Sequence, residues 1–128
     1  MSLQVRITEG HEGAYLITLE GRLDSSTHPD FDGVIKPVLA SSRRLLVLDL
    51  GKLDYISSMG IRSIVNARKA IKAKDGHLVF INPQPQIRRV FDIVSAMPRE
   101  AIFSSIQEAD DFFDMVQKKE IEKSRSSN

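Results

Sequence analysis

The hydrophobic and polar positions of the first fifty residues follow two patterns. Residues 3 to 8 alternate between apolar and polar side chains, and Ala14 to Glu20 alternate again after a turn at residues 11 to 13. This period of two is typical of strands with one wet face, so the two segments predict a hairpin. Residues 45 to 50 are apolar except for Asp49, which predicts a strand covered on both faces, as in a mostly parallel sheet.

A second pattern, with apolar residues every three or four positions, predicts amphipathic helices. It appears between Pro29 and Leu39, between Ile61 and Lys72, between Ile87 and Val94, and between Ile106 and Val116. Pro37 lies inside the first of these segments and is expected to kink or shorten that helix.

Short segments separate the predicted helices. Gly76 in Lys74-Asp75-Gly76 is expected to end the second helix in a left-handed conformation. Residues 78 to 81 predict a short buried strand, and residues 101 to 103 predict a last one. The order β-β-α-β-α-β-α-β-α then predicts one layered α/β domain with right-handed crossovers. We expect this domain to span residues 1 to 117, and the charged residues 118 to 128 to form a flexible tail.

The segment Leu53-Asp54-Tyr55-Ile56-Ser57-Ser58-Met59-Gly60 predicts a hydroxyl-rich turn between the central strand and the helix after it. Ser57 or Ser58 is a natural N-cap, because a serine oxygen accepts hydrogen bonds from backbone N–H groups that otherwise lack partners. Such a helix start also carries the positive end of the macrodipole, so it favours a phosphate or a carboxylate nearby.

Four short stretches of the chain carry a resemblance to a known family. They are Asp49-Leu50 with the segment Tyr55 to Ile61, Gly21-Arg22-Leu23-Asp24 upstream, and Phe80-Ile81-Asn82-Pro83 downstream. In order and spacing they resemble the STAS domain, the family of bacterial anti-sigma-factor antagonists and of the cytoplasmic tails of sulfate transporters. The resemblance covers roughly residues 3 to 116 and implies a single-layer mixed β-sheet with helices packed on one face.

The resemblance also implies a regulatory switch, from which this chain departs. Family members with such a switch carry Asp-Ser-(Ser or Thr)-Gly at the start of this helix, and a kinase-type anti-sigma factor phosphorylates the hydroxyl before the Gly. Aligned on Gly60, that hydroxyl falls on Met59, which cannot accept a phosphoryl group. Two accounts stay open. Either Ser58, with Ser57 behind it, is phosphorylated in its place, or both serines only cap the helix and Met59 is an apolar contact for a partner.

The predicted partner-binding residues lie around this helix start. The resemblance adds the loop of residues 21 to 27, which is otherwise explained as a strand end followed by a helix cap. Arg62, one turn into the helix, belongs either to a solvated face or to a contact with an acidic partner surface. The full set is Asp24, Asp54, Tyr55, Ser57, Ser58, Met59, Gly60 and Arg62.

Composition removes several classes of function. Eighteen basic and seventeen acidic residues give a formal net charge of +1, and no basic run is interleaved with aromatics, so nucleic-acid binding has no support. The chain has no cysteine, and its histidines (His11, His28 and His77) have no neighbour at metal-ligand spacing. No His–carboxylate pair is placed to activate Ser57 or Ser58, so an enzyme is not expected. No apolar run approaches the roughly 18 residues that span a bilayer.

The sequence therefore favours a cytoplasmic anti-sigma-factor antagonist or partner-switching adaptor. Its partner would be a kinase-type anti-sigma factor or a scaffold protein, and the kinase, not this chain, would bind ATP and magnesium. We expect no cofactor, no metal and a monomer or weak dimer. The alternatives are a constitutive, non-phosphorylated STAS module of a larger assembly and, more distantly, a small-ligand or lipid carrier with an apolar pocket.

Overall fold

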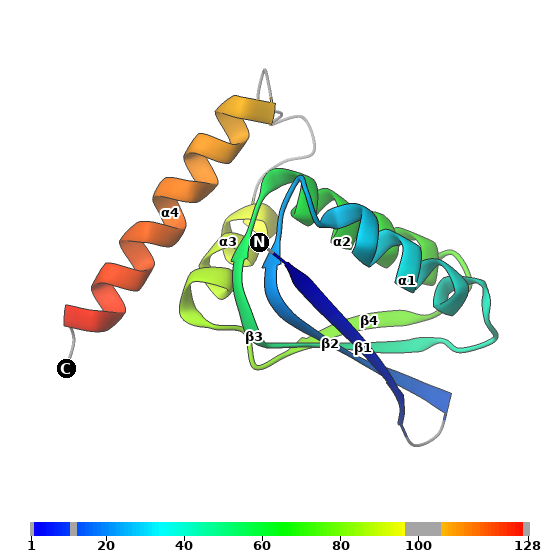
Figure 1. Cartoon of the computed structure of the whole chain (residues 1–128). Helices are drawn as coiled ribbons and strands as arrows, with labels where there is room; N and C mark the ends of the chain where they lie inside the picture. Colours follow the sequence, from blue (N-terminus) through cyan, green and yellow to red (C-terminus); the bar gives the residue numbers. More distant parts are fainter. Residues whose placement is uncertain (1, 11–12, 97–105, 127–128) are drawn as a thin grey trace.

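The computed structural model describes residues 2 to 10, 13 to 96 and 106 to 126. These segments contain four strands and four helices, in the order β-β-α-β-α-β-α-α (Figure 1). The strand expected at residues 101 to 103 lies outside the described residues. The elements are β1 (Leu3–Glu9), β2 (Ala14–Leu23), α1 (His28–Ala40), β3 (Leu45–Ile56), α2 (Ser58–Lys72), β4 (His77–Ile81), α3 (Pro85–Ala96) and α4 (Ile106–Ser126).

The four strands form one mixed sheet in the order β1-β2-β3-β4. Strands β1 and β2 pair antiparallel, which confirms the predicted hairpin, whereas β2 with β3 and β3 with β4 pair parallel. Ile17, Leu48 and Phe80 stand side by side across three strands and point to the same face. Ile17 and Leu48 are fully buried, so this face carries the core.

Helices α1, α2 and α3 lie on one face of the sheet, as the resemblance implies, and α4 packs beside α3 (Figure 1). The other face stays open, which corrects the expectation that the central strand is covered on both faces and that β4 is buried. Leu45, Val79 and Ile81 are 38 to 41% exposed, while the intervening Leu46 and Leu78 are buried. Alternate residues of a strand point to opposite faces, so a sheet with a single helical layer buries every second side chain.

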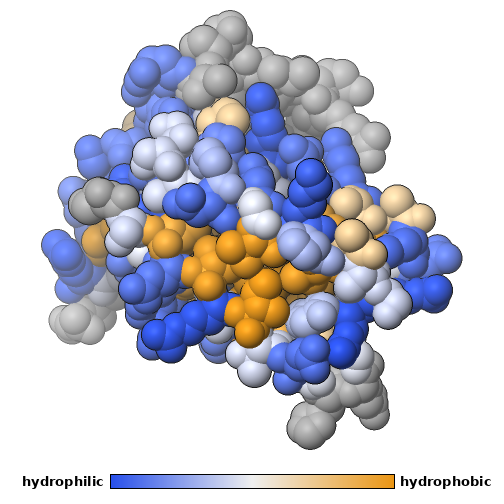
Figure 2. All heavy atoms as spheres, turned by 45° about the vertical axis from the view of Figure 1, so that its right-hand side comes forward, coloured by the Kyte–Doolittle hydropathy of each residue, from blue (hydrophilic) through white to orange (hydrophobic). Residues whose placement is uncertain are grey.

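Apolar side chains also reach the surface elsewhere. Ile7 of the edge strand β1 is 37% exposed, and Leu3 and Val5 are only partly buried against the core. Figure 2 shows apolar atoms gathered in the centre of one side of the molecule and bordered by hydrophilic residues. The single helical layer therefore leaves part of the apolar surface uncovered.

Strand β3 is longer than the sequence indicates and runs to Ile56, so the turn expected at residues 53 to 60 is reduced to Ser57. The reason lies in the neighbouring strand. β2 extends to Leu23, which pairs with Ile56, and two register shifts keep the strands together over this length. Leu53 and Ile56 are consequently buried in the core instead of exposed in a turn.

Two helix ends differ from those expected from the sequence. Helix α1 is not shortened at Pro37 and continues to Ala40. Pro37 has no N–H to donate to the carbonyl of Gly33, but both residues are exposed, so water can reach that carbonyl. After α2 the left-handed residue is Asp75 (φ 61°), not Gly76. Gly76 is required for a different reason: a Cβ there would lie 2.5 Å from the Arg44 carbonyl oxygen.

Helix α4 continues to Ser126, into the residues for which the sequence predicts a flexible tail. An ion pair between Lys118 and Asp114, at 2.9 Å and one turn apart, supports the helix at the point where fraying was expected. Glu120 and Ile121 are half-buried. Helix α4 lies along α3, so packing extends it beyond the apolar pattern of the sequence (Figure 1).

Replacing Gly76 with alanine is expected to lower the free energy of unfolding by about 1–3 kcal/mol, because the new methyl group overlaps the carbonyl oxygens of Arg44, just before β3, and of Ile71 in α2. Gly33→Ala is the matched control: nothing lies within 4 Å of its Cβ position. In the exposed interior of α1 it should raise stability by about 0.5–1 kcal/mol. Urea unfolding of both variants measures the difference, and equal effects at the two sites would contradict the crowding at Gly76.

Candidate protein-docking site

Ser57 is the N-cap of α2. Its backbone is extended (φ −95°, ψ 176°), and its side-chain oxygen accepts a hydrogen bond from the Gly60 N–H at 3.2 Å. Its own N–H donates to the carbonyl of Leu23 at 2.9 Å. With only 4% of its surface exposed, Ser57 is a structural residue. Of the two serines that the sequence offers as caps, the structure therefore selects Ser57.

Gly60 allows α2 to begin close to the end of β2. A Cβ at this position would lie 2.6 Å from the Leu23 carbonyl oxygen and 3.0 Å from Cγ1 of Ile56. Such distances are below van der Waals contact, so no larger residue fits without moving the helix. The Gly60 that the resemblance singled out thus has a steric explanation in this chain.

Ser58, the first residue of α2, is bonded to a carboxylate from the far end of the chain. Both its N–H and its Oγ–H donate to Oδ1 of Asp110 in α4, at 3.0 and 2.6 Å. A carboxylate at a helix N-terminus is stabilised by the free N–H groups and by the macrodipole. Ser58 is half-buried, so its hydroxyl is more accessible than that of Ser57.

Gln117 makes a second polar contact between α4 and this region. Its side-chain oxygen accepts from the Ile56 N–H at 3.0 Å, and its side-chain nitrogen donates to the Ile56 carbonyl at 2.8 Å. The residue is 1% exposed. It satisfies the backbone of the last residue of β3 much as a neighbouring strand would, which fixes α4 over the junction between β3 and α2.

Asp24 organises the loop between β2 and α1. Its Oδ1 accepts hydrogen bonds from Ser26 and Thr27, the shortest being 2.7 Å from the Ser26 hydroxyl, and its Oδ2 lies 3.6 Å from Nε of Arg22. Burial alone would raise the pKa of Asp24, but the hydrogen bonds from Ser26 and Thr27 outweigh it and leave the pKa below the ordinary value of 3.8. These contacts explain the conformation of the loop without any partner.

Tyr55 lies between this loop and α4. The guanidinium of Arg22 lies over its ring at 4.0 Å from the centroid. Burial raises the pKa of Tyr55 above its ordinary value, and the carboxylates of Asp114 and Asp110 raise it further. Asp24 adds to the same effect, so the side chains around Tyr55 belong to one cluster with an excess of negative charge.

Several predicted partner-binding residues thus come together. Tyr55, Ser57, Ser58 and Gly60 surround the junction of β3 and α2, and Asp24 joins them through Arg22 and the end of β2.

The other predicted residues are placed differently. Asp54 faces the start of α3, where its carboxylate accepts from the Gln84 side chain at 3.2 Å. Met59 is half-buried, and Arg62 is exposed on α2.

Comparison with known proteins supports the fold and assigns the family. A model of the STAS domain matches residues 5–109. The chain belongs to the STAS domain family. A relative in Bordetella bronchiseptica, the putative anti-sigma factor antagonist BtrV, is 33% identical over 82 residues, which is 64% of this chain and 71% of the relative. The anti-sigma-B factor antagonist of Staphylococcus epidermidis is 28% identical over 93 residues, 73% of this chain and 85% of the relative.

Solved structures of SpoIIAA share the fold of this STAS domain. The unphosphorylated anti-sigma factor antagonist SpoIIAA has a TM-score of 0.61 at 18% identity, with 84% of this chain and 96% of that chain covered. The phosphorylated form, described as a Bacillus cell fate determinant, has the same TM-score and identity over 71% of this chain and 83% of that chain. At this level of identity the likeness establishes the architecture alone.

Two residues that contact the candidate site, Asp110 and Gln117, were not predicted from the sequence. Asp110 lies 52 residues from Ser58, and no local pattern links them. Gln117 offered a weak signal, because it occupies a core position four residues after Phe113 on the apolar face of α4. Both lie beyond residue 109, where the family match ends.

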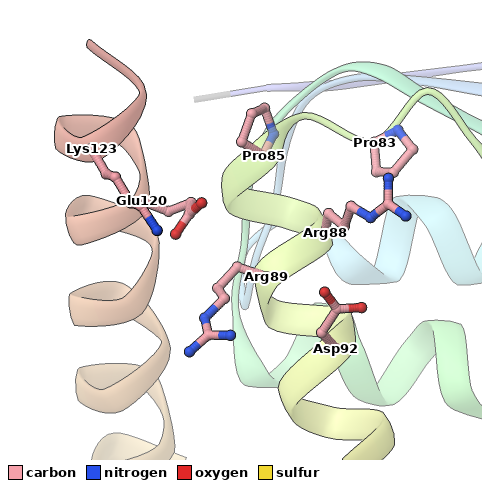
Figure 3. A pocket seen from close by; sticks show the side chains of 7 residues that line it. All are labelled: Pro83, Pro85, Arg88, Arg89, Asp92, Glu120 and Lys123. Carbon is pink, nitrogen blue, oxygen red and sulfur yellow. The ribbon is translucent and has the colours of Figure 1, made fainter. Parts of the chain in front are cut away.

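The grooves beside α4 in this STAS domain are polar. Figure 3 shows one between α3 and α4, with Arg89, Glu120 and Lys123 directed into the space between the two helices. A neighbouring groove is lined by Asp54, Gln84 and other residues that are mostly polar. In the described segments, no group of three or more His, Asp or Glu side chains is placed to hold a metal ion, and no described helix is long and apolar enough to cross a membrane. These two grooves offer no apolar cavity for a lipid.

Ser57→Ala is expected to lower the free energy of unfolding by about 1 kcal/mol, because the Gly60 N–H loses its capping oxygen. The exposed Ser42 provides the matched control, and Ser42→Ala should stay within about 0.5 kcal/mol of the parent. Thermal or urea unfolding is the measurement. A Ser57→Ala variant as stable as Ser42→Ala would show that the cap contributes nothing.

The lowered pKa of Asp24 predicts acid-sensitive stability. Because the folded pKa lies below the unfolded one, the contribution is complete above the unfolded value and is lost as the pH falls through the folded pKa. The stability difference between the parent and Asp24→Asn should therefore shrink between about pH 5 and pH 2. Urea unfolding at several pH values measures this difference, with the exposed Asp30→Asn as control. A difference that is constant across this range would refute the assignment.

Proposed function

We propose that this STAS domain is a partner-switching anti-sigma-factor antagonist that binds its protein partner at the start of α2. The names of the Bordetella and Staphylococcus relatives support the class of partner. The proposed partner is a kinase-type anti-sigma factor. The kinase binds ATP and magnesium, for which this sequence contains no motif. Because anti-sigma factors act on the transcription machinery, the proposed exchange takes place in the cytoplasm.

Ser58 is the proposed phosphorylation site. The single observation that carries this assignment is the different burial of the two serines: Ser57 is 4% exposed and its oxygen caps the helix, whereas Ser58 is half-buried at the first helical position. Met59, at the aligned acceptor position, has no hydroxyl. A kinase therefore reaches the Ser58 hydroxyl with less disruption of the fold than the Ser57 hydroxyl.

Phosphorylation of Ser58 would release the partner. A phosphate adds about −1.5 to −2 charges at pH 7. Asp110 is already in contact with Ser58, and Asp24 and Asp114 contribute negative charge at the neighbouring Tyr55. A partner surface that fits the unmodified site would meet a different charge after modification. The existence of a phosphorylated form of SpoIIAA supports a switch of this kind in the fold family.

A constitutive STAS module that is never phosphorylated is the second candidate. It is favoured by the methionine at position 59, where the family's switch has a hydroxyl, and by the Ser58 hydroxyl, which already donates to Asp110 at 2.6 Å. In this case Ser58 and Asp110 serve only to hold α4 in place, and the partner binds without regulation at this serine.

One incubation tests the two candidates. The protein is mixed with ATP, magnesium and the kinase-type anti-sigma factor that is encoded nearest to its own gene. We expect mass spectrometry to place one phosphate on Ser58, and Ser58→Ala to abolish it while the exposed Ser42→Ala does not. Phosphorylation should weaken binding of that kinase by at least about tenfold, equivalent to about 1.4 kcal/mol. An unmodified chain that binds equally well as Ser58→Ala would favour the constitutive module.

A further inference from the structure

Helix α4 occupies the surface at which the partner is proposed to bind. Asp110 takes both hydrogen-bond donors of Ser58, and Gln117 takes both backbone groups of Ile56. Ala109 and Phe113, on the same side of α4, are buried in the core. One face of this helix is therefore seated directly on the junction between β3 and α2.

The polar contacts of α4 with Ser58 and Ile56 lie on the docking site itself. The Ser58 N–H points out of the first turn of α2, where the macrodipole favours an anionic group. The Asp110 carboxylate fills that position. A partner that recognises the helix start must displace this carboxylate before it reaches Ser58, so α4 and the partner compete for the same donors.

The remainder of the α4 seat is weakly apolar. Among the described side chains of α4, Ala109 and Phe113 are buried in the core, Phe112 and Val116 are only partly buried against it, and Met115 is 45% exposed. Toward its C-terminal end the helix faces α3 across the charged groove of Figure 3, which includes Arg89 and Glu120. Polar and charged contacts are more easily exchanged for water than a continuous apolar interface.

We propose that α4 is an intramolecular cover of the docking site and that the Ser58–Asp110 contact is its latch, which a negative charge on Ser58 opens. Opening does not admit the partner to the modified chain, because the phosphate that displaces α4 also changes the charge that the partner meets at Ser58. The proposal rests on the proposed function for the trigger, phosphorylation of Ser58. Modification removes the Oγ–H donor and sets a phosphate beside the Asp110 carboxylate. Two of the nearby cations are already engaged, because Arg22 lies 3.6 Å from Asp24 and Lys118 lies 2.9 Å from Asp114.

Hydrogen exchange on the purified full-length chain tests the latch without a kinase or a partner. In Ser58→Asp we expect the amides of α4 to exchange at least about tenfold faster than in the parent, while those of β2 and β3 keep their protection. Adding Asp110→Asn should restore the protection of α4, because the asparagine amide donates to the new carboxylate. Asp111→Asn is the matched control: it removes the same charge from an exposed neighbour, which accepts from Gln107, and should not restore protection.

A second variant keeps the test independent of the new aspartate. Asp110→Ala removes the acceptor of both Ser58 donors and should also raise exchange in α4 selectively. The proposal is overturned if α4 exchanges as in the parent in both Ser58→Asp and Asp110→Ala, if Asp111→Asn rescues as well as Asp110→Asn, or if all elements lose protection together. A failure of the kinase to modify Ser58 would refute the proposed function, whereas these exchange results would still decide the latch.

Discussion

The close approach between the end of β2 and the start of α2 positions every part of the docking site. The Leu23 carbonyl accepts from the Ser57 N–H at 2.9 Å, and the same oxygen would lie 2.6 Å from a Cβ at residue 60. A hydrogen bond and a missing side chain therefore hold the helix start against the strand. Because β2 leads directly into the loop of Asp24, this one contact also fixes the loop beside the helix.

Local chemistry made part of this arrangement predictable from the sequence. The cap at Ser57, the amphipathic period of α2 and the hairpin of β1 and β2 depend on residues close together in the chain. The length of β3 was not predictable in this way, because it is set by the pairing of Ile56 with Leu23 in another strand. The sequence predicts a left-handed conformation at Gly76 because glycine adopts it readily, but the left-handed residue is Asp75. A glycine is required at position 76 because the Arg44 carbonyl leaves no room for a Cβ.

The contacts of α4 were beyond sequence reasoning for a related reason. A carboxylate in a helix of mixed charge resembles any solvated side chain until the fold shows what it faces. Asp110 and Gln117 acquire their roles only because the first turn of α2 and the last residue of β3 present unpaired backbone groups in the same place. The open groups at the end of one element thus determine which residues of a distant element matter.

The sign of a phosphate effect at Ser58 follows from the sizes of three opposing interactions. The helix terminus favours an anion by about 0.3–1 kcal/mol at an exposed site. Arg62, exposed and four residues along the same helix face, adds about 0.2–1 kcal/mol as a surface ion pair. A unit charge 4 Å from Asp110 is opposed by about 4 kcal/mol at the effective dielectric near a protein surface. Repulsion therefore exceeds the two attractions, and the least costly response is for the phosphate to turn toward Arg62 while Asp110 and α4 move away.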